Sequence, residues 1–232
     1  MLLFAGTSGF SYPGWRGSFY EEGLPESKML AAYAAKLSTV EINNTFYRMP
    51  KASLLTGWAE KTPATFSFAL KAPRRITHIS KLKDTEELVA TLFQLAEGLG
   101  AKQGPVLFQT PPFLRMDAGL LAAFCAALPK NARATLEFRH PSWFCDEVYA
   151  VLSAAGVALC ACEVDADEGT GAPFVRTAPF TYVRLRRAIY EPAELDAVVA
   201  RIHALGVEQA FVYFKHEVLG PKYALELSAR ST

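Results

Sequence analysis

The sequence has few of the residues that define several common kinds of functional site. It contains four cysteines and four histidines. Only Cys160 and Cys162 are close, and a one-residue gap inside a strand pattern suits neither a redox motif nor a zinc site. No histidine pair has His-x-x-x-His spacing. We therefore expect reduced thiols, and no motif requires a cofactor or a metal, although Glu41, Glu137, Glu163 and Asp165 leave open a hard cation held together with phosphate.

Long apolar runs and a strong excess of one charge are also absent. No apolar stretch approaches the ~20 residues that span a bilayer. The start, Met1 to Gly6, lacks the basic region and the full apolar stretch of a signal peptide. The formal net charge of +1 excludes a protein coated with positive charge, although a local patch can exist within a neutral total. These observations predict a cytoplasmic protein without a membrane partner.

Strand and helix patterns alternate along the 232 residues. Strand-like segments occupy 2–8, the stretch that begins at Val40, 66–71, 106–109, 134–139, 157–162, 181–186 and 209–215. Helical spacing occurs at 27–36, 52–61, 85–99, 118–128, 146–155, 192–205 and 222–229. Strands separated by helices pair in parallel, and eight such strands close a barrel. We predict one α/β domain over 1–232, a (β/α)8 TIM-type barrel in which a loop at 165–179 replaces the helix after the sixth strand.

The competing architecture is a doubly wound open sheet. Such a sheet usually has a glycine-rich phosphate-binding turn after its first strand. Here the segment Gly6-Thr7-Ser8-Gly9 follows that strand, and its glycines lack the required spacing. The barrel is therefore the favoured prediction.

Polar side chains alternate with apolar ones near the ends of several predicted strands. Glu41 and Asn43 alternate with apolar residues in the second strand, and Glu137 and Arg139 do so in the fifth. In a barrel the apolar face of a strand packs on helices while the other face points inward. The inward set predicted for the carboxyl-terminal mouth is Glu41, Asn43, Lys71, Gln109, Glu137, Arg139, Arg184, Arg186 and Lys215. Barrel enzymes place their chemistry at this mouth.

Cations crowd these strand ends and the loops that follow them. Arginine forks match phosphate or carboxylate oxygens, and interleaved aromatic rings can stack on a sugar or base. We predict catalytic roles for Glu41, Glu137 and Lys71, with the carboxyls as general acid or base if burial or a like charge tunes them. A Schiff base at Lys71 is an alternative. The predicted substrate-binding residues are Asn43, Tyr47, Arg48, Arg74, His78, Gln109, Arg139, His140, Trp143 and Arg184.

Each of these features also has a purely structural explanation. The carboxylates can pair with nearby cations in a buried ion network, the cations can form a solvated rim, and the aromatic rings can pack loops over the barrel. Three functions therefore stay open. The first is an enzyme acting by acid–base chemistry on an anionic, phosphorylated substrate. The others are a non-catalytic binder of nucleic acid or nucleotide, and a structural or partner-binding barrel.

Several segments, in order along nearly the whole chain, resemble one family. They are Gly6–Tyr12 with Trp15, Val40–Arg48 with Pro50, Lys71–Arg74 with Thr77 and His78, Gln109–Pro112 and Glu137–Phe144. Together they resemble the YecE-like family, domain of unknown function 72. The resemblance implies a TIM barrel and supplies no established reaction. Two segments depart from the family pattern and suggest a more cationic pocket: Arg184–Arg187 replaces an Arg-Leu-His-Gly type motif, and Lys215–Glu217 replaces an Asn-rich turn.

Overall fold

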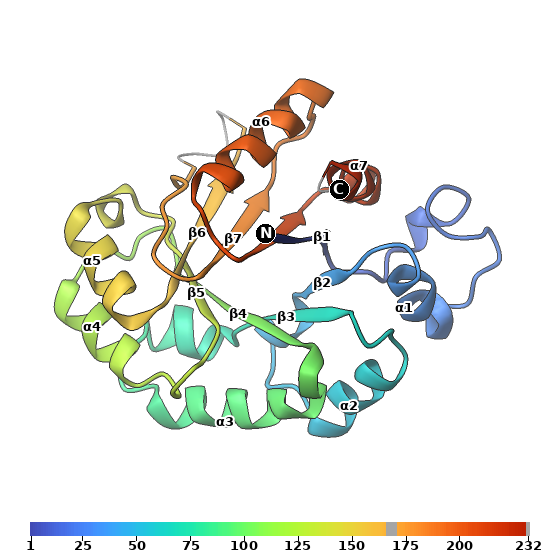
Figure 1. The fold of residues 1–232 in the computed structure, drawn as a ribbon. Coiled ribbons are helices and arrows are strands. Elements are labelled where there is room, and N and C mark those ends of the chain that lie inside the picture. The colour runs from blue at the N-terminus through green and yellow to red at the C-terminus, as the bar shows by residue number, and fades with distance from the viewer. Residues whose placement is uncertain (166–170, 231–232) are drawn as a thin grey trace.

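The computed structural model describes residues 1–165 and 171–230 and contains a closed barrel of parallel strands in the order β1 to β8. Helices surround the strands (Figure 1), so the predicted TIM-type barrel is confirmed. The strands are β1 (Leu2–Ser8), β2 (Thr39–Ile42), β3 (Ser67–Lys71), β4 (Gln103–Gln109), β5 (Ala134–Glu137), β6 (Ala158–Glu163), β7 (Phe180–Leu185) and β8 (Gln209–Phe214). The helices are α1 (Glu26–Ala34), α2 (Ala52–Glu60), α3 (Glu86–Ala96), α4 (Ala118–Ala126), α5 (Asp146–Ala155), α6 (Pro192–Ala204) and α7 (Gly220–Ala229).

The connection between β6 and β7 differs from the others. Its described parts, 164–165 and 171–179, contain no helix, and Ala172 pairs with Cys162 through two backbone hydrogen bonds. Residues 166–170 of the predicted loop lie outside the described part of the chain. The expected replacement of a helix by a loop therefore holds for the described residues.

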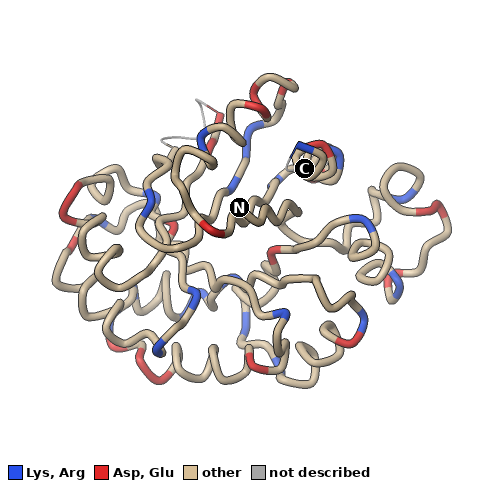
Figure 2. The backbone as a smooth tube through the Cα atoms, viewed as in Figure 1, with Lys and Arg blue, Asp and Glu red and all other residues tan. Residues whose placement is uncertain are grey.

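The barrel interior changes from aromatic to charged along its axis. Phe4 and Phe211 stack with ring centroids 4.8 Å apart, and Tyr182 and Tyr213 lie beyond them toward the mouth. These rings fill the middle of the barrel, where this fold more often has branched aliphatic side chains. Toward the carboxyl ends of the strands the buried side chains are charged: Glu41 on β2, Glu137 on β5 and Arg184 on β7. Figure 2 shows where acidic and basic residues lie along the backbone. None of the described helices combines the length and apolarity needed to cross a bilayer.

The first two strands approach so closely that only glycine fits at their junction. A Cβ atom on Gly6 would lie 2.1 Å from the carbonyl oxygen of Thr39. The Tyr33 hydroxyl closes the same junction by donating to that oxygen and accepting from the Thr7 amide, both at 2.9 Å. Neither strand can retreat without breaking these buried hydrogen bonds. Gly6 thus sets the spacing between β1 and β2.

We expect Gly6→Ala to lower the free energy of unfolding by about 1–3 kcal/mol, the usual cost of overpacking a well-packed core. Gly57 in α2 provides the matched control, because no heavy atom lies within 4 Å of a Cβ placed there. Gly57→Ala should stabilise the chain by up to ~1 kcal/mol through helix propensity. Urea unfolding of both variants measures the difference. Equal midpoints for Gly6→Ala and wild type would contradict the proposed close approach.

A cationic candidate site at the carboxyl ends of the strands

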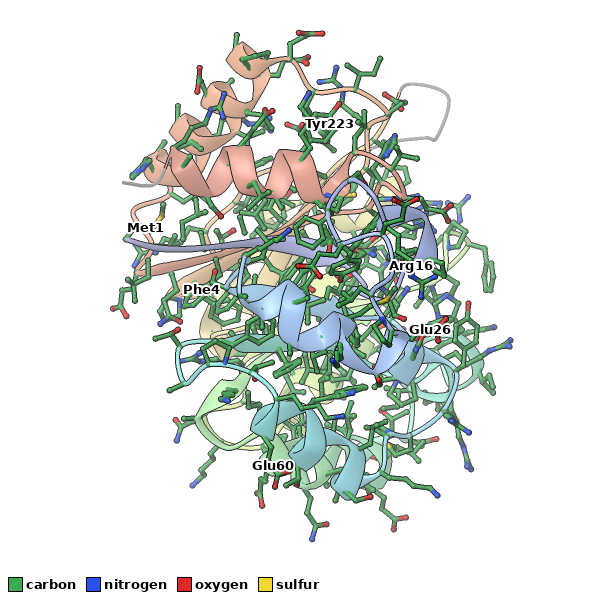
Figure 3. All side chains as sticks on the ribbon, turned by 90° about the vertical axis from the view of Figure 1, so that its right-hand side faces the viewer. Met1, Phe4, Arg16, Glu26, Glu60 and Tyr223 are labelled. Carbon is green, nitrogen blue, oxygen red and sulfur yellow. The ribbon has the colours of Figure 1, made fainter. Side chains whose placement is uncertain are left out.

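A cavity of about 430 Å³ opens at the carboxyl ends of the strands. In Figure 3, β1 runs from the labelled Met1 toward the side of the labelled Arg16, so these strand ends lie on that side. The cavity is lined by Ser8, Tyr12, Asn43, Phe46, Tyr47, Lys71, Arg74, His78, Gln109, Arg139, Arg184, Arg186 and Lys215. Eight of the predicted catalytic and substrate-binding residues therefore share one cavity: Asn43, Tyr47, Lys71, Arg74, His78, Gln109, Arg139 and Arg184. Arg186 and Lys215, predicted to point inward at the mouth, also line it.

An arginine on β7 joins two glutamates beneath this cavity. Arg184 Nη1 donates to Glu137 Oε2 at 2.6 Å, and Arg184 Nη2 donates to Glu41 Oε1 at 3.0 Å. All three residues are at most 1% exposed. Charges buried this deeply persist because each has an opposite charge and further hydrogen bonds. The buried ion network is therefore present, and it forms the floor of the cavity.

Neutral polar side chains complete this network. Glu41 accepts hydrogen bonds from Ser8 at 2.6 Å, Tyr182 at 2.7 Å and Asn43 at 3.1 Å. Glu137 accepts from Gln109 Nε2 at 2.7 Å, and the amide oxygen of Gln109 accepts from Lys71 Nζ at 2.9 Å. A continuous chain of hydrogen bonds thus links Lys71, in the cavity wall, to both buried carboxylates.

The surroundings of the two glutamates favour their ionised forms. Burial raises the pKa of Glu41, but Arg184 and the hydrogen bonds from Ser8 and Tyr182 outweigh burial and lower that pKa to about 2. For Glu137, burial is likewise outweighed by Arg184 and Gln109, so its pKa is also lowered. Both pKa values are lowered rather than raised, so neither carboxyl is tuned toward a general acid at neutral pH. Neither glutamate is among the residues that line the cavity, and both hold the guanidinium of Arg184.

Lys71 has the titration behaviour that the glutamates lack. Burial and the neighbouring Arg184 lower its pKa to about 8, although Glu41 and Glu137 oppose the shift. Its ammonium group also lies 4.3 Å from the centroid of the Phe46 ring. The neighbouring His78 has a lowered pKa because of burial and the positive charges of Lys71 and Arg74. Lys71 therefore exchanges its proton near neutral pH while facing the cavity.

Positive charge dominates the cavity wall. Six of its residues are lysine or arginine, and no aspartate or glutamate lines it. Two of the six, Arg186 and Lys215, come from the two segments that depart from the family pattern. Within the described residues, the buried Nε–H of Arg184 has no protein partner. The wall thus presents a cationic surface suited to an anion.

Three residues predicted to bind substrate do not line the cavity. Trp143 is fully buried, its ring stacks on Phe138 at 4.2 Å, and its Nε1 donates to the Leu114 carbonyl oxygen. His140 faces Ser142, whose hydroxyl lies 2.8 Å from its Nδ1. Arg48 is exposed outside the cavity wall. The structure therefore does not bring these three together with the other predicted residues, since packing places Trp143 and His140 in the loop after β5 and Arg48 lies on the exposed loop after β2.

Two members of the network were missed in the sequence. Ser8 ends β1, and Tyr182 lies two residues before Arg184 on β7. Strand alternation places Tyr182 on the same inward face as Arg184, so that signal was available. Ser8 is an uncharged residue at a strand end that glycines flank, so no sequence pattern marked it as a candidate site residue. Both hydroxyls bind Glu41, and hence help to position Arg184.

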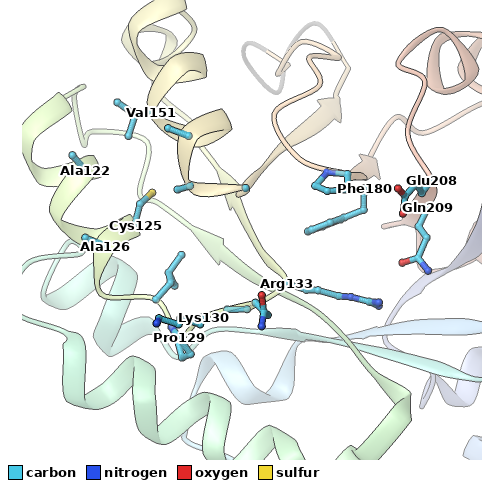
Figure 4. Close-up of a pocket in the computed structure, with 17 residues that line it drawn as sticks. Ala122, Cys125, Ala126, Pro129, Lys130, Arg133, Val151, Phe180, Glu208 and Gln209 are labelled. Carbon is cyan, nitrogen blue, oxygen red and sulfur yellow. The ribbon is translucent and has the colours of Figure 1, made fainter.

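A larger hollow of about 850 Å³ lies at the opposite end of the barrel (Figure 4). Its wall includes Ala122, Cys125 and Val151 from α4 and α5, with Phe180 and Gln209 at the amino ends of their strands. It is lined largely by small apolar side chains and has no network like that beneath the mouth. Within residues 1–165 and 171–230, no three His, Cys, Asp or Glu side chains form a candidate metal cluster.

A comparison with known protein families identifies the family of this chain. Residues 4–231 match the family described as "Protein of unknown function DUF72". The chain belongs to this family. The YecE-like resemblance seen in the sequence is therefore confirmed, and the cationic cavity is a feature of a DUF72 protein.

Relatives and a solved structure agree with this assignment. The chain is 28% identical over 144 residues to the UPF0759 protein YecE of Escherichia coli, covering 62% of this chain and 50% of YecE. It is 29% identical over 156 residues to the UPF0759 protein YunF of Bacillus subtilis, covering 64% and 54%. The chain thus spans about half the length of these relatives. A DUF72 structure from Thermotoga maritima has a TM-score of 0.86 and 25% identity, covering 100% of this chain and 99% of that one.

Proposed function

We propose that this DUF72 protein is an enzyme that binds an anionic, phosphorylated substrate in the cavity at the mouth of the barrel. The observation that carries the proposal is the wall of six cationic residues without a carboxylate. Arg184 is paired with Glu41 and Glu137 beneath the cavity, but no carboxylate stands in the wall itself among the other cations. The cavity volume of about 430 Å³ also lies within the range typical of small-molecule sites.

In this proposal the cations have two tasks. Arg74 and Arg139 bind the anion from the rim of the cavity, where neither makes an ion pair with a described residue. Arg184 contributes from the floor, because the two glutamates hold its guanidinium in one orientation. Guanidinium forks match phosphate oxygens in pairs, which gives orientation as well as affinity.

Lys71 is the proposed general base. Its pKa of about 8 leaves a substantial neutral fraction near physiological pH, and the amine lies in the cavity wall. A base works best when its pKa is near the operating pH. Gln109 supports the amine by accepting its hydrogen bond and is itself anchored on Glu137. The network beneath the cavity therefore fixes Lys71 as well as Arg184.

A thermal-shift screen tests the binding part of the proposal. The ligands are inorganic phosphate, pyrophosphate, sugar phosphates and nucleotides, each with and without Mg²⁺. A ligand that binds the native state stabilises it by mass action. Arg139→Gln should weaken this binding about 10- to 150-fold, the effect of losing hydrogen bonds to a charged group. Arg133→Gln, which removes an arginine from the opposite end of the barrel, should leave binding unchanged.

Two outcomes would contradict the proposal. One is an absence of stabilisation by any phosphate compound. The other is an equal response in wild type, Arg139→Gln and Arg133→Gln, which would place the anion away from the mouth.

A further inference from the structure

Three consecutive loops beside the cavity carry an excess of positive charge. The segments considered follow β2, β3 and β4 and comprise residues 43–50, 72–83 and 110–116, and the loops after β3 and β4 then continue with one aspartate each, Asp84 and Asp117. The cations of the three segments are Arg48, Arg74, Arg75, Lys81, Lys83 and Arg115, all exposed. We call these loops the basic rim. A net charge of +1 for the whole chain makes this local concentration distinctive.

The basic rim also exposes apolar side chains. Tyr47 is 74% exposed, Ile79 is 63% exposed and Phe113 is 65% exposed, one on each loop. Single exposed apolar residues are ordinary, but three on adjoining loops indicate an interaction surface. Their neighbours are cations, and Lys81 lies 5.5 Å from the centroid of the Phe113 ring. Exposed apolar side chains and positive charges therefore occur together on these loops.

Contacts between the loops make the basic rim continuous. The rings of Phe46 and His78 are 5.0 Å apart, which joins the loop after β2 to the loop after β3. The contact between Lys81 and Phe113 joins the loop after β3 to the loop after β4. Phe46 and His78 also line the cavity, so the surface leads directly into it.

The middle loop is held in an unusual backbone conformation. Residues Arg75–Ile79 form a π-helical turn, a rare element that occurs often at functional sites. Lys81 and Leu82 follow with φ angles of 52° and 70°, a region that non-glycine residues seldom adopt. Such conformations cost free energy and tend to cluster at binding and active sites. The turn points His78 into the cavity wall while leaving Ile79 exposed.

We propose that the basic rim binds single-stranded nucleic acid and delivers one of its phosphate or nucleotide groups into the cavity. This inference rests on the proposed function and names its substrate class. The rim cations follow a phosphate backbone, while Tyr47 and Phe113 offer faces on which unpaired bases stack. Duplex DNA hides its base faces, so the exposed rings favour single strands.

An anionic membrane surface is the main alternative partner for such a mixture. Three features of the rim favour nucleic acid. Its apolar side chains come from separate loops with cations between them, rather than from one apolar face. They border a polar, cationic cavity that a bilayer would cover without using. Its exposed aromatic rings, Tyr47 and Phe113, offer flat faces on which bases can stack.

Fluorescence anisotropy with labelled oligothymidylate tests the inference on the full chain. Phe113→Ala should weaken binding about 5- to 150-fold through lost stacking. Leu225→Ala is the matched control, since Leu225 is also exposed but lies on α7. Arg75→Gln and Lys83→Gln should each reduce the slope of log affinity against log salt by about 0.7. A duplex of the same length should bind more weakly than the single strand.

Three results would overturn the inference. They are oligothymidylate binding that Phe113→Ala and Leu225→Ala affect equally, a duplex affinity equal to that of the single strand, and binding to phosphatidylserine vesicles without binding to oligothymidylate. Pyrophosphate separates this inference from the proposed function, because Phe113, Arg75 and Lys83 do not line the cavity. Binding of pyrophosphate without binding of oligothymidylate would contradict the nucleic-acid role of the basic rim and leave the proposed anion site intact. If the protein bound neither ligand, the proposed anion site would be contradicted as well.

Discussion

Arg184→Met is expected to lower the free energy of unfolding by about 3–5 kcal/mol at neutral pH. The substitution removes the shared partner of Glu41 and Glu137, which are then left as buried carboxylates without an ion pair. Methionine fills much of the space of the arginine stem, so the lost pairing accounts for most of the effect. Arg187→Met is the control, because Arg187 is about one-third exposed and a surface ion pair contributes at most ~1 kcal/mol.

A triple variant separates charge from packing. In Arg184→Met with Glu41→Gln and Glu137→Gln, no buried charge remains, and we expect most of the lost stability to return. Urea unfolding measures both variants. If Arg184→Met unfolded at the same urea concentration as Arg187→Met, the buried network would not support the barrel as described.

The free energy of unfolding lost in Arg184→Met should depend on pH with a definite sign. In the wild type the pKa of Glu41 is about 2, below its ordinary 4.5, so its contribution is complete above pH 4.5 and fades as the pH falls toward 2. In Arg184→Met the burial of the carboxyls raises their pKa values instead. The variant should therefore gain stability relative to the wild type between pH 7 and pH 5. An unchanged difference between the two proteins over that range would contradict this account.

Lys71→Met should lower the rate of the reaction about 10²- to 10⁴-fold, the usual contribution of a general base. The reaction is to be measured with whichever phosphorylated ligand the thermal-shift screen identifies. In the wild type, kcat/KM should rise as the pH passes about 8, because the neutral amine is the base. The variant should lose this inflection. Its affinity for the ligand should fall far less, since Arg74, Arg139 and Arg184 remain.

Glu137→Gln provides the comparison for Lys71. We assign Glu137 to positioning, and the amide of glutamine preserves its shape while removing its charge. The variant should keep a pH-dependent rate with an altered apparent pKa, because one negative charge near Lys71 is lost. A Lys71→Met enzyme with full activity, or one that retains the wild-type pH profile, would remove Lys71 from the role of base.

Local patterns were sufficient to predict the barrel and much of the site. Alternation along single strands placed Glu41, Glu137 and Arg184 on the inward face, and parallel strands in a closed barrel bring those ends together. Lys71 and Gln109 follow from the same two facts, whereas Tyr47, Arg74 and His78 lie on the loops after the strands and line the cavity because those loops surround the mouth. No knowledge of distant contacts was needed, since the strand period and the strand order determine which side chains share the mouth.

Strand patterns do not predict features that distant contacts decide. The pKa of Glu41 depends on Arg184, which lies 143 residues along the chain, so the sequence could not reveal that this pKa is lowered. Trp143 follows a strand end as a binding residue would, but it packs flat on Phe138. The surface or core location of such an aromatic residue is fixed by packing between loops, which strand periodicity does not describe.

The most direct test of the cationic site is the position of a bound anion. We would determine a crystal structure after soaking with tungstate, a heavy mimic of phosphate that anomalous scattering locates without ambiguity. The account predicts tungstate in the cavity at the mouth, within hydrogen-bonding distance of Arg139 and of Lys71 or Arg184. Tungstate found only at the opposite end of the barrel, or a cavity that stays without tungstate while the surface binds it elsewhere, would contradict the account.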